Sequence, residues 1–341
     1  MGIHDIGEFG FIDRIREGCL IRPERVVKAI GDDAAAFETS SGQLGLITTD
    51  MLVDRIHFLR EAIAGDDLGY KSLAVNLSDI AAMGGIAREA FVSIAIPENC
   101  DLDYLDQLYR GMKRLAEKYE VNILGGDTTA SKTDLIINVA VFGAAPPDQI
   151  LYRSGALPGD TVFCTGCLGD SRAGLEMILN SVPAENRWQE RLREAHLRPE
   201  PHLSEGRFLA SSPGVHSAID VSDGLSSDLG HLLEESGVGA RLSAADIPLS
   251  VELKKYCAAS GSDPVTTALS GGEDYVLLGT CAADQAAGLQ ARFEKEFDRP
   301  LFCIGEITAG RDPLLTLPDG RVMPIAKKGW NHFKEKSDER T

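Results

Sequence analysis

Predicted strands and helices alternate along almost the whole of this 341-residue sequence, and this alternation restricts the chain to α/β or α+β folds. Apolar runs and helical periodicity define the elements. Strands are predicted at residues 44–49, 90–96, 121–124, 135–142, 161–165, 217–220, 275–280 and 301–307. Helices are predicted at residues 66–83, 104–119, 171–180, 202–211, 225–236 and 284–297.

A proline-containing connector divides this pattern near its middle. The stretch Ala144-Ala145-Pro146-Pro147-Asp148 continues neither a strand nor a helix pattern. Because the chain is longer than one ordinary domain, we predict two domains, each with its own core. The first covers residues 1–148, the second is an α/β domain covering 149–333, and residues 334–341 are a polar, disordered tail.

The charge balance limits the class of partner. The sequence has 34 basic and 52 acidic residues, a net charge of -18, and its lysines and arginines are scattered. A nucleic-acid partner is therefore excluded, and an anionic ligand needs metal ions or a few placed cations. We expect a cytoplasmic protein without a membrane segment, because no secretory signal or membrane-spanning apolar run is visible and the seven cysteines are dispersed.

Five short clusters place aspartate beside glycine or hydroxyl residues. Carboxylate and hydroxyl oxygens are the ligands that Mg²⁺ prefers, and glycine lets the backbone approach a phosphate closely. A turn or a helix cap explains any one cluster as well, but five together predict a magnesium and phosphate site. The clusters are Gly31-Asp32-Asp33, Thr48-Thr49-Asp50, Ser78-Asp79, Gly125-Gly126-Asp127-Thr128-Thr129 and Asp220-Val221-Ser222-Asp223-Gly224.

The predicted helix at 66–83 carries one of these aspartates on a polar face. Ser72, Asn76 and Asp79 follow at helical spacing, and small apolar residues cover much of the remaining surface. Asp79 is therefore expected to be partly buried, where a carboxylate must be paired or must bind a metal. The simpler alternative is an ion pair with Lys71 or a nearby arginine.

Three clusters follow predicted strands, where ligands collect in α/β sheets. Asp50 ends the strand at 44–49, and the glycines of Gly125-Gly126-Asp127 follow the strand at 121–124. The third cluster, Asp220-Val221-Ser222-Asp223-Gly224, precedes the predicted helix at 225–236, and the N-terminus of a helix attracts anions. Asp223 is equally explained as the N-cap of that helix. The segment Ser270-Gly271-Gly272-Glu273-Asp274 is predicted to form a further glycine turn. This turn either places Glu273 where it can hydrogen-bond a ligand or is a plain hairpin-like turn. The sequence has neither a P-loop nor a kinase catalytic-loop motif.

Motifs spread over nearly the whole chain resemble the thiamine-monophosphate kinase family, within the aminoimidazole-ribonucleotide-synthetase-like superfamily. They occur in the same order as in that family. They include Gly31-Asp32-Asp33-Ala34-Ala35, Thr49-Asp50, residues 70–84, Leu124-Gly125-Gly126-Asp127-Thr128-Thr129, Tyr152-Arg153-Ser154-Gly155-Ala156, residues 220–229, Ser270-Gly271-Gly272-Glu273-Asp274-Tyr275 and Lys328-Gly329-Trp330-Asn331-His332-Phe333.

The resemblance implies particular site residues. Magnesium ligands would be Asp33, Thr48, Thr49, Asp50, Asp79, Asp127, Asp220 and Asp223. ATP contacts would be Tyr119, Gly126, Asp127, Arg153 and Ser222, and thiamine monophosphate contacts would be His57, Glu273 and Trp330. The family also implies a homodimer whose N-terminal sheets pair into a barrel. Residues 180–200 resemble the family least, and no role is assigned to them.

The implied reaction is the last step of thiamine diphosphate biosynthesis, in which ATP phosphorylates the phosphate of thiamine monophosphate and ADP is released. The second pKa of a phosphate is about 6, so the acceptor oxygen is already ionised near neutral pH and needs no general base. Several Mg²⁺ ions held by carboxylates would screen and align the two anions. Trp330 would stack on the cationic thiazolium ring, unless it only packs at the C-terminus. His57 would contact the substrate, unless it is a bystander.

Alternative functions remain open at the sequence level. A selenophosphate synthetase would need a reactive cysteine in a glycine-rich N-terminal segment, and Cys19 lacks that setting. A hydrogenase-maturation relative would need a C-terminal cysteine, whereas the last one here is Cys303. An aminoimidazole ribonucleotide synthetase, from the same superfamily, is a further alternative function. A nucleotide or metal sensor without turnover would need fewer carboxylates than the five clusters supply.

Overall fold

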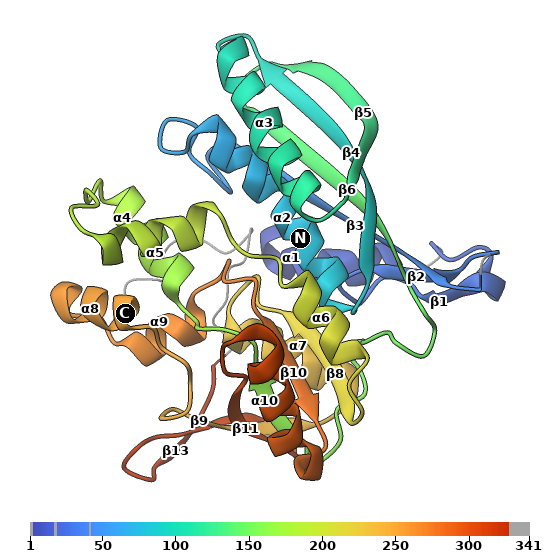
Figure 1. The fold of residues 1–341 in the computed structure, drawn as a ribbon, viewed down its shortest axis with the longest axis vertical. Helices are drawn as coiled ribbons and strands as arrows, with labels where there is room; N and C mark the ends of the chain where they lie inside the picture. The colour runs from blue at the N-terminus through green and yellow to red at the C-terminus, as the bar shows by residue number, and fades with distance from the viewer. Residues whose placement is uncertain (1–2, 17–18, 41, 327–341) are drawn as a thin grey trace.

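The computed structural model describes residues 3–16, 19–40 and 42–326, which form two lobes, each built on one sheet (Figure 1). The tail predicted at 334–341 and the substrate contact predicted at Trp330 lie outside the described residues. The first sheet ends at Ala145 and the second begins at Thr161, on either side of the predicted connector. The exact boundary at residue 148 stays a prediction.

The first lobe contains a six-stranded sheet with the order β1-β2-β3-β6-β4-β5. Neighbouring strands are antiparallel except for the parallel pair β4 and β5. The strands are β1 (Val26–Lys28), β2 (Ala35–Glu38), β3 (Leu44–Val53), β4 (Ile86–Pro97), β5 (Asn122–Ser131) and β6 (Ile136–Ala145). Helices α2 (Gly65–Ala82) and α3 (Leu102–Lys118) cover one face of this sheet (Figure 1). Before them come α1 (Ile3–Arg16) and the short 3-10 helix η1 (Pro23–Arg25).

Helix α2 is largely buried. Apolar side chains such as Leu73, Leu77 and Ile80 are fully buried, and so is Lys71. The helix also packs very closely on α3, because a Cβ atom added at Gly69 would lie 1.7 Å from the carbonyl oxygen of Leu108. Asp79 itself is half-buried, which confirms the prediction that this carboxylate is partly buried.

The second lobe contains a seven-stranded sheet with the order β13-β12-β9-β11-β7-β10-β8, antiparallel except between β9 and β12. Its strands are β7 (Thr161–Cys164), β8 (Val215–Asp220), β9 (Gly239–Ser243), β10 (Leu277–Cys281), β11 (Phe302–Thr308), β12 (Pro313–Thr316) and β13 (Val322–Pro324). Its helices are α4 (Asp170–Leu179), α5 (Arg187–Leu197), α6 (Leu203–Ala210), α7 (Leu225–Ser236), α8 (Val251–Ser260), α9 (Pro264–Ser270) and α10 (Ala283–Phe297).

The hydrophobic core of the first lobe continues into the second lobe, which also has a separate core cluster of its own around Val162, Ile219 and Leu242. A single cluster of buried residues joins Leu73 of α2 to Phe163, Ala218 and Leu277 of the second sheet. Ser78 of α2 also donates a hydrogen bond to Asp220 of β8 at 2.6 Å. Residues of α2 therefore meet residues of β8 at a packed boundary. Among the described residues, no helix combines the length and the apolar character that crossing a membrane requires.

The prediction of a mixed two-domain α/β or α+β fold is confirmed, but two local predictions about strand ends are wrong. Asp50 lies inside β3, and residues 125–129 lie inside β5, where they pair with β4. In both places, hydrogen bonds to a neighbouring strand continue the extended backbone beyond the apolar run. The structure also adds elements that the apolar pattern did not predict, namely α1, η1, β1, β2, α5, β9, α8, α9, β12 and β13.

Candidate active site

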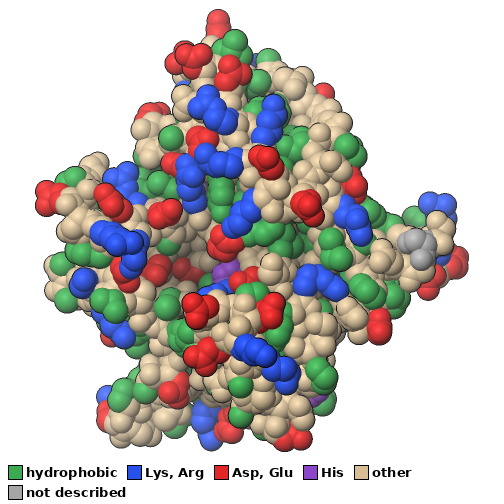
Figure 2. Space-filling model, in the orientation of Figure 1, with side chains coloured by type: hydrophobic (Ala, Val, Ile, Leu, Met, Phe, Trp, Pro, Cys, Tyr) green, Lys and Arg blue, Asp and Glu red, His purple; other side chains and the backbone are tan. Residues whose placement is uncertain are grey.

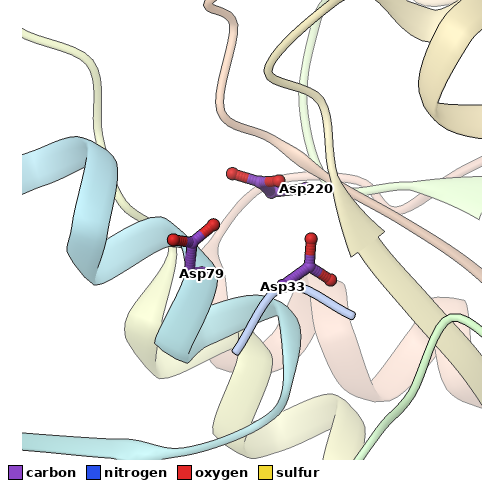
Figure 3. A group of neighbouring side chains, drawn as sticks. All are labelled: Asp33, Asp79 and Asp220. Carbon is purple, nitrogen blue, oxygen red and sulfur yellow. The ribbon is translucent and has the colours of Figure 1, made fainter. Parts of the chain in front are cut away.

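Three carboxylates meet at the boundary between the lobes (Figure 3). Asp33 comes from the loop before β2, Asp79 from α2 and Asp220 from the end of β8. Each offers an oxygen, and the three oxygens lie within 4.8 Å of one another. Three of the five predicted clusters therefore converge through tertiary packing.

This carboxylate group has the properties of a cation site. Burial raises the pKa of Asp220 to about 8, with a further increase from the charge of Asp33. Burial, and then the charges of Asp50, Asp220 and Asp33, raise the pKa of Asp79 well above its usual range. Oδ2 of Asp33 is buried without a hydrogen-bond partner. An unpartnered buried oxygen is costly, and a donor set made only of oxygens fits Mg²⁺.

Strand β3 adds a fourth carboxylate and a hydroxyl. Because strand side chains alternate between faces, Thr48 and Asp50 both point towards α2. The Thr48 hydroxyl donates to Asp79, and the backbone N–H of Asp50 donates to Oδ1 of Asn76 at 3.0 Å. Burial, and then the charge of Asp33, raise the pKa of Asp50 to about 6. Asn76 is a positioning residue whose polar place on the predicted helix face was visible in the sequence.

Two predicted metal ligands lie apart from this group within one chain. The side chain of Thr49 points to the opposite face of the sheet, where its hydroxyl donates to the Val139 carbonyl at 3.2 Å and accepts from Asn138 at 2.9 Å. Asp127 is exposed on edge strand β5, and β4 and β6 lie between β5 and β3. Asp127 also accepts a hydrogen bond from the N–H of Thr128 at 2.9 Å.

Asp223 lies in the loop between β8 and α7, close to Asp220 in sequence. The N-cap of α7 is Gly224, so the alternative explanation of Asp223 as that N-cap is wrong. The loop is held instead by Asp228, whose Oδ2 accepts from the N–H groups of Asp223 at 3.1 Å and Gly224 at 3.0 Å. Sequence reasoning missed Asp228, although an acidic residue in the first turn of a helix is a known signal. Burial, and then the charge of Glu8, raise the pKa of Asp223 to about 6.

The residues predicted to contact ATP each have a different partner in the structure. Arg153 forms an ion pair with Asp33, with Nη2 2.6 Å from Oδ1. The Ser222 carbonyl accepts from the N–H of Glu273 at 2.7 Å. The Tyr119 hydroxyl donates to Glu200. A Cβ atom added at Gly126 would lie 1.7 Å from the Val92 carbonyl oxygen, so close strand pairing already requires glycine there.

Glu273 and His57 are both predicted to contact the substrate, and the charge of His57 is one of the influences on the pKa of Glu273. The buried Lys71 lies 2.9 Å from Oε1 of Glu273, so Lys71 pairs with Glu273 and the alternative pairing with Asp79 is wrong. Burial acts to raise the pKa of Glu273, but neighbouring charges, that of Lys71 first, outweigh it and the pKa is lowered. Nδ1 of His57 accepts from the N–H of Val53 at 3.0 Å.

The surface view places acidic side chains in a hollow between the upper and lower lobes (Figure 2). Clustered carboxylates repel free anions, so a phosphate can enter such a site only with cations. The described part of the chain thus combines a carboxylate group that could hold a cation, the guanidinium of Arg153 beside it, and the residues Glu273 and His57. This arrangement can hold metal-bound phosphates and a separate organic group.

Comparisons with known proteins identify the family. The chain matches the models for the AIR synthase related protein N-terminal domain over residues 31–145 and the C-terminal domain over residues 158–329. A thiamine-monophosphate kinase of Aquifex aeolicus is 36% identical over 333 residues, which cover 98% of this chain and 100% of the relative. The thiamine-monophosphate kinase of Escherichia coli K12 is 37% identical over 332 residues, which cover 96% and 98%. The chain belongs to the thiamine-monophosphate kinase family.

A solved structure supports the same assignment at the level of the fold. The structure of AaThiL complexed with AMPPCP and TMP has a TM-score of 0.85 and 34% sequence identity, and the match covers 97% of this chain and 99% of that one. The expected two-domain architecture of the thiamine-monophosphate kinase family is therefore confirmed. The expected barrel involves a second copy and stays a prediction.

Proposed function

We propose that this protein transfers the γ-phosphoryl group of ATP to thiamine monophosphate, forming thiamine diphosphate and ADP. The observation that carries this proposal is the group of Asp33, Asp79 and Asp220, with an unpartnered buried oxygen, in a chain 36–37% identical to thiamine-monophosphate kinases. The related structure complexed with AMPPCP and TMP supports the two substrates.

The chemistry requires positioning more than acid–base catalysis. A phosphate oxygen of thiamine monophosphate attacks the γ-phosphorus, the bond from that phosphorus to the β,γ-bridging oxygen breaks, and ADP leaves with that electron pair. The attacking oxygen is already ionised near neutral pH, since the second pKa of a phosphate is about 6. A general base is therefore unnecessary, which agrees with a site made of carboxylates.

Mg²⁺ is the cofactor that this donor set fits. Bound there, it would supply the positive charge that screens the two phosphate-bearing substrates from each other. We assign its binding to Asp33, Thr48, Thr49, Asp50, Asp79, Asp127, Asp220 and Asp223. The first group to test is Asp33, Asp79 and Asp220, because their oxygens already lie within 4.8 Å of one another.

The remaining residues are assigned to the two substrates. ATP would be bound by Tyr119, Gly126, Asp127, Arg153 and Ser222, and the ion pair of Arg153 with Asp33 places that guanidinium beside the carboxylates. Thiamine monophosphate would be bound by His57, Glu273 and Trp330. The charge interaction between His57 and Glu273 supports a shared role for those two.

We further propose that the protein is a homodimer that pairs through the outer face of the first sheet. Ile47, Met51 and Phe91 lie on that face and are 43%, 54% and 46% exposed. Exposed apolar side chains gathered on one face favour an interface. Thr49 and Asp127 share this face, so a second copy would cover both. Cytoplasmic location also stays a proposal, supported by seven free cysteines.

Incubation with MgATP and thiamine monophosphate tests the reaction directly, with phosphorus NMR to follow ADP and thiamine diphosphate. We expect diphosphate signals that require both substrates and Mg²⁺. Absence of thiamine diphosphate, or equal turnover with free thiamine, would contradict the proposal. ATP binding without turnover would favour the sensor alternative, and the same assay with selenide or an aminoimidazole precursor covers the other relatives.

A further inference from the structure

Lys71 is buried at the boundary between the lobes. It belongs to α2, the helix that also carries Asp79, and it is 1% exposed. Its ammonium group contacts residues of the second lobe, Glu273 and His196. A lysine is rarely buried to this extent unless its charge is compensated, and the carboxylate of Glu273 supplies that compensation.

Lys71, His196 and Glu273 form a closed triangle of polar contacts. Nζ of Lys71 lies 2.9 Å from Oε1 of Glu273 and 3.5 Å from Nε2 of His196. Nδ1 of His196 lies 3.2 Å from Oε2 of Glu273 and 3.1 Å from Oγ of Ser171. Each carboxylate oxygen of Glu273 therefore has a neighbouring donor group.

The protonation of His196 follows from its surroundings. Burial, and then the charge of Lys71, lower the pKa of His196 to about 4, so the ring is neutral at pH 7. A lysine ammonium group only donates, so Nε2 of the ring must accept and the single ring proton lies on Nδ1. That proton points towards Glu273 and Ser171. The ring thus connects helix α5 to the carboxylate without adding a second positive charge.

The backbone of Glu273 also needs support. Its φ is +64°, in the left-handed region that residues other than glycine rarely adopt. Its N–H donates to the Ser222 carbonyl at 2.7 Å, and its side chain remains 26% exposed. The carboxylate is therefore held by protein on one side and is open on another, with His57 close enough to influence its charge.

We infer that Lys71 and His196 are positioning residues that fix the carboxylate of Glu273 for binding the thiamine half of the substrate. The inference rests on the proposed function, because Glu273 is assigned there to thiamine monophosphate. It gives a role to α5 and the 180–200 region, where the sequence resembles the family least. It also connects the helix that carries Asp79 to the substrate contact in the other lobe.

A double-mutant cycle tests this inference. Lys71→Met should raise KM for thiamine monophosphate about tenfold and leave KM for ATP within twofold, because the loss acts through Glu273. In the Glu273→Gln background, the same change should alter KM for thiamine monophosphate less than twofold. His196→Leu should show the same dependence on Glu273, and Lys71→Arg should recover part of the loss.

The matched control is Arg207→Met. Arg207 also joins the lobes, because its Nη1 donates to the Gly84 carbonyl at 2.5 Å, and its described hydrogen bonds do not involve Glu273. We expect a lower melting temperature and an unchanged KM for thiamine monophosphate. If Lys71→Met does not fold, the neutral Lys71→Met/Glu273→Gln protein and the His196 variant still complete the comparison.

The possible outcomes separate the two claims. Effects of Lys71→Met that are equal in both backgrounds, or equal for both substrates, overturn the inference while the proposed function stands. A wild-type protein that does not phosphorylate thiamine monophosphate overturns the proposed function and this inference with it. A selective KM effect that disappears in the Glu273→Gln background supports both.

Discussion

At the scale of single residues, we predict that Asp79, a proposed metal ligand, lowers the stability of the metal-free protein. Its carboxylate lies among Asp33, Asp50 and Asp220, and mutual repulsion together with burial raises its pKa. Asp79→Asn should therefore lower activity about 100-fold or more, since it removes charge from the cation site. Without Mg²⁺, the melting temperature should stay the same or rise, and the increase caused by MgCl₂ should shrink.

Thermal melts with and without MgCl₂, together with the NMR assay, measure both effects. The exposed Asp246→Asn makes the same chemical change outside the site and should alter neither. A large loss of melting temperature without Mg²⁺ would mean that Asp79 is structural. Retained activity would remove it from the cation site.

A second prediction at this scale concerns His202, which is 7% exposed and contacts Oγ of Thr165 at 2.7 Å. Burial, and then the charge of Arg299, lower its pKa to about 3. Because the unfolded chain takes up a proton near pH 6.5 and the folded chain does not, stability is full above pH 6.5 and falls as the pH drops towards 3. This single site should cost about 2 kcal/mol between pH 6.5 and 5.0.

Urea unfolding at pH 7.5 and 5.0 measures this loss. His202→Asn should make the free energy of unfolding depend less on pH by a similar amount. Asparagine suits the test because it tolerates the φ of +45° at this position and can still contact Thr165. An unchanged pH dependence in the variant would show that His202 is not the responsible group.

At the scale of elements, α2 depends on very close packing against α3. A methyl group at Gly69 would overlap the Leu108 carbonyl, because its Cβ would lie 1.7 Å from that oxygen. Gly69→Ala should therefore reduce the free energy of unfolding by about 1–3 kcal/mol or more. The control is Gly288→Ala at an exposed position of helix α10, which should gain about 0.5–1 kcal/mol from helix propensity. Urea titration of both proteins checks the opposite signs.

Some secondary-structure elements could be predicted from the sequence and others could not. The helix at 66–83 was recognisable because its periodic apolar positions are all buried, and α2 spans Gly65–Ala82. The strand at 121–124 was predicted too short, because β5 continues through two glycines and polar residues by pairing with β4. The apolar pattern records side-chain burial. It does not record backbone hydrogen bonds along an exposed edge strand such as β5.

At the scale of the whole molecule, the proposed dimer predicts what a charge on the outer face of the first sheet will do. Phe91→Asp places a charge on that face and should convert the proposed dimer into a monomer, measured by light scattering after size-exclusion chromatography. Leu102→Asp is the control, because Leu102 is 72% exposed at the start of α3, away from the sheet, and should leave a dimer. A monomeric wild type, or a dimeric Phe91 variant, would contradict the proposed interface.

The sequence by itself determined the chemistry available to this protein. Aspartates beside glycine and hydroxyl residues indicated a hard cation and phosphate, because oxygen ligands and close backbone approach are local properties of those residue types. Only the tertiary structure decided which residues meet. It joined Asp33, Asp79 and Asp220, turned Thr49 to the other face of β3, and paired Lys71 with Glu273. These contacts depend on strand pairing and on packing between lobes, and both join residues that lie far apart in the sequence.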